Sequence, residues 1–178
     1  PEQLWKALVE GKDLIRSAPS KRWGIRPNLA LRHPSDSDSD RSWSDRGGYV
    51  LEPDLDFQGV RLHSDILNDL DPLFHWAIHC SNQALRQVKK VNVKKTGVVL
   101  GNLSFPSVSM AKLAKQIWFG EPNLLHPLNR FMSGAPALLV KKALGLEGPG
   151  FALDSACASA LYALKHACDR LSEGSADL

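Results

Sequence analysis

Two short apolar runs constrain the fold of this chain more than any other feature. One spans Thr96 to Leu100 and the other spans Gly150 to Leu153. Continuous apolar runs of this length are typical of strands that are covered on both faces. Strands that alternate with helical patterns predict an α/β protein. We expect helices at about 109–119, 128–144 and 157–171, the last one ended by Gly174.

The first half of the chain adds two helices and a long loop. Helical spacing predicts a helix over 2–10, and Asp71 followed by Pro72 has the pattern of an N-cap before a helix that runs to about Val88. Residues 28–48 lack apolar periodicity, which predicts a surface loop, and a short strand is expected at 49–51. The helix after Asp71 is expected to bury Phe74, Ala77, Ile78, Ser81, Leu85 and Val88.

Composition and charge narrow the class of protein. The chain is 43% hydrophobic, and none of its apolar runs approaches the roughly 18–20 residues that span a bilayer. The net charge of +3 is small and dispersed, which argues against nucleic-acid binding. The cysteine count is odd, and Cys157 and Cys168 lie about 16 Å apart if they share one helix, too far for a disulfide. These features predict a cytoplasmic protein in a reducing compartment.

The segment from Gly150 to Leu161 carries the clearest indication of chemistry. Its order is a short apolar strand, a turn of small residues, and a helix that begins at Cys157. Unpaired N–H groups at a helix N-terminus stabilise a thiolate, and small neighbours leave room for a substrate. We expect Leu161, Leu164, Cys168 and Leu171 to anchor the helix in the core. From the residues alone, Cys157 is either a nucleophile or a buried structural cysteine.

The same segment resembles a known family. The sequence DSACASAL, which contains Cys157, resembles the D-x-A-C-[SA]-S-[SA]-L nucleophile segment of β-ketoacyl synthases. Further similar elements are the W-x-x-L-x-x-G to P-x-x-R-W opening at 5–23, G-G-Y at 47–49, D-P at 71–72, N-R-F-M-S at 129–133 and G-P at 148–149. Together they look most like the ketosynthase domains of type I polyketide synthases and polyunsaturated fatty acid synthases, and the GNLSFPS stretch at 101–107 favours the latter.

The resemblance implies a fold, a reaction and partners. The fold is thiolase-like, layered α/β/α/β/α in two related halves, and residues 1–178 make up a truncated domain that contains the first half. The reaction is a decarboxylative Claisen condensation, in which the Cys157 thiolate accepts an acyl chain from an acyl carrier protein and a malonyl unit loses CO₂ and attacks the thioester. The N–H of Cys157 forms part of the oxyanion hole. A homodimer and neighbouring synthase domains are implied, with no cofactor besides the carrier's phosphopantetheine.

The histidines of this chain do not replace those of the family. The family's two catalytic histidines lie downstream of the cysteine and have no counterpart here, and since the chain begins with Pro1 we expect a fragment that is inactive alone. His166 follows Cys157 by nine residues, which places it on the opposite helix face about 13 Å along the axis. His75 and His79 have a spacing that can chelate a metal, but no third ligand is identifiable. His75 also departs from the family's D-P-Q-x-R, in which a basic residue stands at its place.

Three alternatives stay open. Lys89, Lys90, Lys94 and Lys95 flank a turn that is either simply solvated or a docking site for an acidic carrier. A thiolase-type acyltransferase that does not decarboxylate would share the cysteine but not the opening motif. A non-catalytic structural partner of a condensing subunit would share the fold, although the retained cysteine argues against it. The sequence has no glycine-rich dinucleotide loop after a strand, so a nucleotide-binding enzyme is not supported. It also has no G-x-S-x-G motif, so a serine hydrolase is not supported.

Overall fold

The computed structural model describes all residues except 1, 20, 21, 24, 25, 36, 38, 39, 52, 104–106, 121, 123–125, 131 and 132. Its contacts separate the chain into two units, residues 1–54 and 55–178. Within the described part of the chain, none of the helices is long and apolar enough to cross a membrane.

The first unit contains two helices and a two-stranded ribbon. Its elements are α1 (Glu2–Val9), β1 (Arg16–Ser17), α2 (Pro27–Ala30) and β2 (Arg46–Gly47). β1 and β2 pair antiparallel, and Leu31 forms an isolated bridge with Ser42. The guanidinium of Arg32 lies 4.1 Å from the centre of the Trp43 ring, a cation–π contact across the same bridge. The predicted opening helix is confirmed.

Two expectations for the first unit are corrected. The strand predicted at 49–51 is wrong, because the backbone that offers pairing partners, at 16–17, lies opposite 46–47. Beyond this pair the chain turns, and the N–H of Tyr49 donates to the carbonyl of Gly47 at 3.1 Å. The predicted loop 28–48 is only partly irregular, since α2 begins at Pro27 and β2 lies within the range. Positions 36, 38 and 39 of that loop lie outside the described residues.

The second unit is built on two parallel strands. Its elements are α3 (Ser64–Asp69), α4 (Pro72–Arg86), η1 (Val93–Lys95), β3 (Val98–Gly101), α5 (Val108–Phe119), η2 (Pro127–Arg130), α6 (Ala135–Leu144), β4 (Gly150–Leu153), η3 (Ala156–Ala158) and α7 (Ser159–Ser172). β3 and β4 run from the pair Val98 and Gly150 to the pair Gly101 and Leu153. Both strands lie where the apolar runs predicted them.

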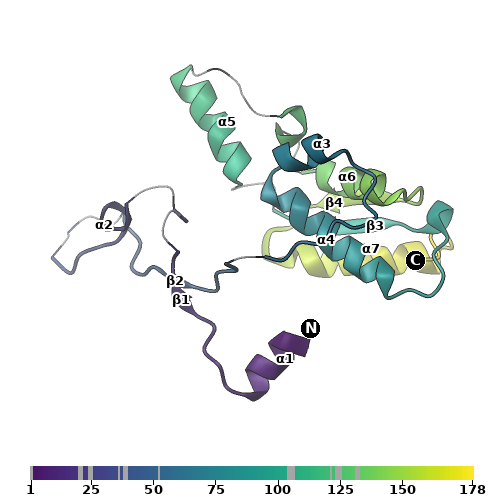
Figure 1. Ribbon diagram of the computed structural model, residues 1–178, viewed down its shortest axis with the longest axis horizontal. Helices are drawn as coiled ribbons and strands as arrows, with labels where there is room; N and C mark the ends of the chain where they lie inside the picture. Colours follow the sequence, from purple (N-terminus) through teal and green to yellow (C-terminus); the bar gives the residue numbers. More distant parts are fainter. Residues whose placement is uncertain are drawn as a thin grey trace. The chain divides into compact units, whose positions relative to one another are not determined.

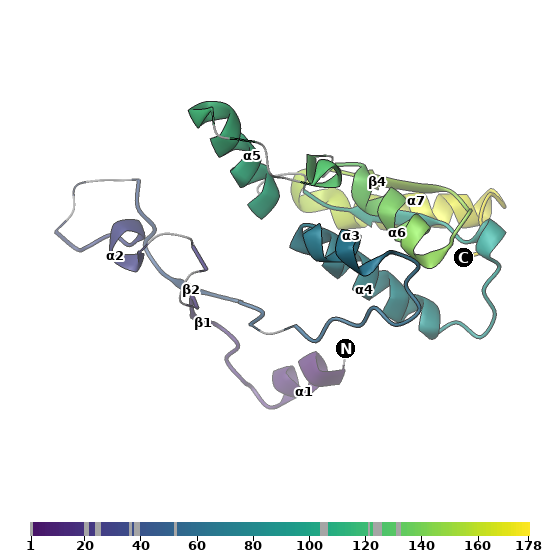
Figure 2. The same cartoon turned by 45° about the horizontal axis from the view of Figure 1, so that its top comes forward.

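Helices cover both faces of the strand pair. Val98 and Leu100 of β3 belong to the apolar cluster with α4 and α6, whereas Val99 lines a small cavity with Ala167 and Leu171 of α7. The resulting order, α4 and α6 on one side and α7 on the other, can be followed in Figures 1 and 2. The layered α/β arrangement therefore follows from the alternation seen in the sequence.

Helix α4 provides the centre of the core. Asp71 caps it by accepting from the N–H of Leu73 at 2.9 Å, and Pro72 occupies the first turn, as predicted. Phe74 and Ile78 are fully buried. The other residues expected on the buried face, Ala77, Ser81, Leu85 and Val88, are half-buried. The sequence did not predict the buried Asn82, whose side chain donates to the carbonyl of Gln58 at 3.1 Å.

Truncating the central aromatic tests this description of the core. Phe74→Ala is expected to lower the free energy of unfolding by about 3–5 kcal/mol, because the aromatic ring is lost and a cavity remains. Leu138→Ala is the matched control, since Leu138 is 59% exposed on α6. Denaturant titration would compare the two variants. Equal losses would contradict the assignment of Phe74 to the core.

Two expectations for the second unit are corrected. The single helix predicted at 128–144 is divided into η2 and α6. Pro136 fits only the first turn of a helix, so it marks a new start; Phe131 and Met132 lie outside the described residues.

The leucine face of α7 does not anchor this helix in the core, contrary to what had been expected. Leu161 is 71% and Leu164 63% exposed, Leu171 and Cys168 are exposed, and the buried residues are Ser159 and Ala163. Helix α3 was not predicted.

Candidate active site

The turn that carries Cys157 is held by its own polar groups. The N–H of Ala156 donates to Oδ1 of Asp154 at 3.0 Å. Oγ of Ser159 accepts from the N–H of Ser155 and donates to the carbonyl of Ala156, both at 2.8 Å. Ser159 is buried, so these bonds tie the first turn of α7 to the end of β4. The chain can therefore reverse within a few residues and still hold one conformation.

The residue before Cys157 has a strained backbone. Ala156 has φ +48° and stands alone among the described non-glycine residues in having a positive φ. A left-handed conformation at such a residue costs on the order of 1–3 kcal/mol and is found most often at functional sites. The strained residue therefore directly precedes Cys157, whose side chain is exposed.

Cys157 itself is exposed at the start of a helix. It lies in η3, and the α-helix proper begins two residues later, at Ser159, rather than at the cysteine as predicted. Its thiol is free and exposed. Among the described residues, its backbone N–H has no hydrogen-bond acceptor. The turn thus presents a thiol and an unpaired donor from the same residue.

Gly101 lets α7 approach β3 closely at this turn. A Cβ at Gly101 would lie 2.4 Å from the carbonyl oxygen of Ser159 and 2.8 Å from the nitrogen of Ala160. Both are backbone atoms, so a side chain here would push the beginning of α7 away from the strand. Because α7 lies so close to β3, only small side chains fit between them. This explains why Ser159 and Ala163 are buried while the leucines of α7 are exposed.

A methyl group at Gly101 should therefore be costly. Gly101→Ala is expected to lower the free energy of unfolding by about 1–3 kcal/mol, because the backbone of α7 has to move. In Gly48→Ala, the control, the new Cβ meets nothing within 4 Å. Thermal unfolding of the two variants measures the difference. A Gly101→Ala protein as stable as the control would contradict the close approach of α7 and β3.

The histidines of the chain take part in local contacts. Nε2 of His75 lies 2.6 Å from the carbonyl of Leu67, and Nδ1 of His79 accepts from the N–H of Asp56 at 2.9 Å. His166 lies edge-on to Phe151 with 5.7 Å between ring centres. On the same helix, the ammonium group of Lys165 donates to the carboxylate of Asp169. This hydrogen bond and the positive charge of Lys165 hold the pKa of the Asp169 carboxyl below its ordinary value. Within the described residues, no cluster of three potential metal ligands is present.

The lysine turn lies at the far end of the strands from Cys157. η1, with Lys94 and Lys95, precedes β3, whereas the cysteine turn follows β4, and the two strands are parallel. Lys95 pairs with Asp177 at 3.4 Å. A carrier docked at the lysines would therefore have to deliver its acyl group past the length of the strands.

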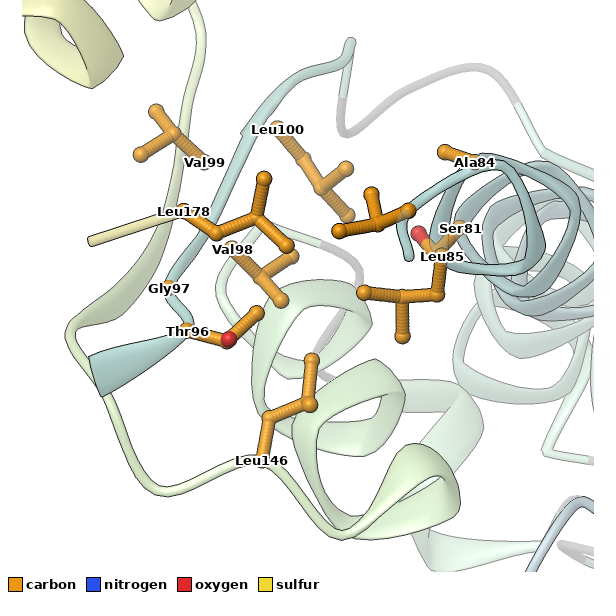
Figure 3. A pocket seen from close by; sticks show the side chains of 11 residues that line it. Ser81, Ala84, Leu85, Thr96, Gly97, Val98, Val99, Leu100, Leu146 and Leu178 are labelled. Atoms are coloured by element: carbon orange, nitrogen blue, oxygen red, sulfur yellow. The ribbon is translucent and has the colours of Figure 1, made fainter. Parts of the chain in front are cut away.

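A cavity of about 230 Å³ lies beside β3 but not at the cysteine. Figure 3 shows that Leu85 of α4, Val98 and Leu100 of β3, and Leu178 line it. Its lining is almost wholly apolar and holds no nucleophile other than the hydroxyls of Ser81 and Thr96. The geometry of the Cys157 turn, rather than the volume of this cavity, identifies the candidate active site.

A model of one protein family matches the whole chain. Its description is "Beta-ketoacyl synthase, N-terminal domain", and it covers residues 1–178. The chain belongs to the β-ketoacyl synthase family. The family predicted from the cysteine segment and the motifs before it is therefore confirmed.

Known ketosynthases and polyketide synthases are similar to this β-ketoacyl synthase chain. The PKS-NRPS hybrid synthetase ATPKS of Aspergillus niger is 29% identical over all of the chain and 10% of its own length. The phthioceranic/hydroxyphthioceranic acid synthase of Mycobacterium tuberculosis is 30% identical over all of the chain and 8% of its own length. The β-ketoacyl synthase chain thus spans about a tenth of these relatives.

Solved structures identify the fold. The structure named PfaC Keto synthase-Chain length factor has a TM-score of 0.88 and 32% identity, covering 99% of this chain and 21% of that one. The oxazolomycin ketosynthase domain OzmH KS7 of Streptomyces albus has a TM-score of 0.66 and 20% identity, covering 98% of this chain and 29% of that one. The predicted thiolase-like fold is confirmed, and the β-ketoacyl synthase chain corresponds to its N-terminal part.

Proposed function

We propose that the chain is the nucleophile-bearing part of a ketosynthase that extends acyl chains in fatty acid or polyketide synthesis. Cys157 is the proposed nucleophile. The observation that supports this assignment most is the strained turn at Ala156, which holds an exposed thiol and an unpaired N–H together. Membership of the family makes acyl transfer the reaction that such a pair would serve.

The proposed reaction has two steps. In the first, the Cys157 thiolate attacks the carbonyl of an acyl thioester on a carrier protein, and the carrier's phosphopantetheine thiolate leaves and takes up a proton. In the second, a malonyl thioester loses CO₂, and the resulting carbanion attacks the acyl thioester at Cys157. A new carbon–carbon bond forms, the carrier holds the β-ketoacyl product, and the Cys157 thiolate is regenerated.

The unpaired N–H of Cys157 has a place in both steps. Each attack converts a thioester carbonyl into a tetrahedral oxyanion, and a fixed N–H donor beside the sulfur stabilises that charge. Removal of one such donor typically costs about 3–4 kcal/mol of transition-state stabilisation. The decarboxylation builds charge on the oxygen of a second carbonyl, which needs donors of its own. In the family these are histidines downstream of the cysteine, so the complete reaction requires residues beyond this chain.

The proposal includes partners but no bound cofactor. The acyl and malonyl groups would arrive on the phosphopantetheine arm of an acyl carrier protein. Neighbouring synthase domains are also proposed, because the relatives named above are much longer than this chain. A homodimer is proposed because the family resemblance implies one. The position of the lysine turn favours simple solvation of that turn over carrier docking.

Selective alkylation tests the assignment of the nucleophile. We expect limiting iodoacetamide to modify Cys157 before Cys80 and Cys168, because among the three cysteines only Cys157 lies in the turn before a helix N-terminus, where backbone N–H groups stabilise negative charge on an attacking group. All three thiols are exposed, so a difference in exposure would not produce this preference. Cys168 was expected to be buried, but it is exposed, so burial does not protect it from the reagent. Mass spectrometry of the digested protein reports the order. Faster labelling of Cys80 or Cys168 would argue against Cys157 as the nucleophile.

A further inference from the structure

Asp71 joins two helices that are far apart in the sequence. Its Oδ1 accepts from the N–H of Leu73 in the first turn of α4, and its Oδ2 accepts from the N–H of Ser109 in the first turn of α5, both at 2.9 Å. Asp71 is 4% and Ser109 6% exposed. A cap on α4 needs only one of the two oxygens. The second oxygen therefore does something else, which is to tie α5 to α4.

Asn129 closes the same buried network. Its Oδ1 accepts from the N–H of Asp71 at 2.8 Å, and its Nδ2 donates to the carbonyl of Asp69 at 2.7 Å. Asn129 is 3% exposed and lies in η2, the element against which α5 packs. Two sequence motifs that are 58 residues apart, at 71–72 and at 129, thus meet through one hydrogen bond. We name Asp71, Ser109 and Asn129 the α5 tether.

Helix α5, which the tether holds, begins at the end of the strands where the cysteine turn lies. The chain leaves β3 at Asn102, whose N–H donates to the carbonyl of Leu153 at 3.1 Å, one residue before Asp154. Figures 1 and 2 both show the lower end of α5 at the end of the second unit where β4 leads into α7. A substrate that approaches Cys157 therefore arrives at the end of the strands where α5 begins, and the first turn of α5 is held by the tether.

We propose that Asp71 is a positioning residue for acyl loading of Cys157, acting through the α5 tether. It fixes the first turn of α5, and the acyl chain contacts this helix on its way to the thiol in the proposed loading step. The inference rests on the proposed function, since it assumes that Cys157 accepts an acyl group. Asp71 touches neither the thiol nor the reacting carbonyl in this account.

Asp71→Asn separates the two functions of the carboxylate. Asparagine caps helices as well as aspartate does, so the cap on α4 is kept. Its amide group has one acceptor oxygen, so the N–H of Ser109 loses its partner. Asp71→Ser is a second variant with the same logic, because serine also caps α4 but is too short to reach α5. Ser107→Ala is the matched control, since it removes the cap of α5 itself, at Met110, and leaves the tether intact.

The test compares acyl loading with alkylation in the full-length protein that carries this chain. Asp71→Asn is expected to raise KM for transfer from an acyl-loaded carrier protein by about tenfold, with kcat and the iodoacetamide rate at Cys157 within about twofold of the parent, because only the bulky substrate needs the positioned segment. Ser107→Ala should leave all of these values near the parent's. An unchanged KM in both Asp71 variants, or an equal fall in acyl transfer and alkylation, would overturn the inference. Absence of acyl transfer in the parent would instead overturn the proposed function beneath it.

Discussion

Cys157→Ala should abolish formation of the acyl-enzyme while leaving the fold intact. The loss is complete because the sulfur of Cys157 forms the bond to the acyl group. Stability should hardly change, because Cys157 is exposed and removal of its sulfur leaves no internal cavity. Ala156 and Ala158 already flank the position, so alanine suits the turn.

This prediction needs a thiol control and two measurements. Cys168→Ala removes another exposed thiol from α7, eleven residues on, and should keep full acyl transfer. Thermal unfolding shows that each variant is folded, and intact-mass spectrometry after incubation with an acyl-loaded carrier shows the adduct. Covalent acylation that persists in a folded Cys157→Ala protein would refute the mechanism.

The isolated 178-residue chain should form no β-ketoacyl product. Decarboxylation needs preorganised donors for the enolate oxygen, each typically worth about 3–4 kcal/mol when removed singly. His166 cannot supply one, since it packs on Phe151 from the middle of α7. Leu161 and Leu164 also present apolar surface on the same helix, which makes the isolated chain prone to association.

The assay incubates the purified chain with acyl-loaded and malonyl-loaded carrier and follows the β-ketoacyl product. The full-length protein serves as the positive control, and light scattering reports whether the isolated chain stays dispersed. Turnover by a dispersed chain that is comparable to the control would show that no residues beyond this segment are needed. The proposed dependence on downstream histidines would then be wrong.

Several elements could be predicted from the sequence because their causes are local. β3 and β4 are apolar runs long enough for one strand each, and α4 starts at an Asp-Pro pair whose cap needs only the next few residues. The turn between β4 and α7 could be located in the same way, because it lies between an apolar strand and a helical pattern, although α7 begins at Ser159 and not at Cys157 as predicted. In each case the pattern and the element occupy the same stretch of chain.

Other features depend on partners that are remote in the sequence. Which face of α7 is buried depends on Gly101, 58 positions before Ser159, because the close approach there selects small side chains over leucines. The strand at 46–47 is placed by its partner at 16–17 rather than by its own composition. The hydrogen bond between Asp71 and Ser109 likewise spans 38 residues, and neither residue type predicts it from the sequence.

Peptide mapping tests most directly whether Cys157 carries the acyl group. The full-length protein would be incubated with an acyl-loaded carrier, quenched in acid, digested and analysed by tandem mass spectrometry. We predict that the acyl mass lies on the peptide that contains Cys157 and is released by hydroxylamine, as a thioester is. An acyl group on Cys80, Cys168 or a hydroxyl residue, with Cys157 unmodified, would contradict the account.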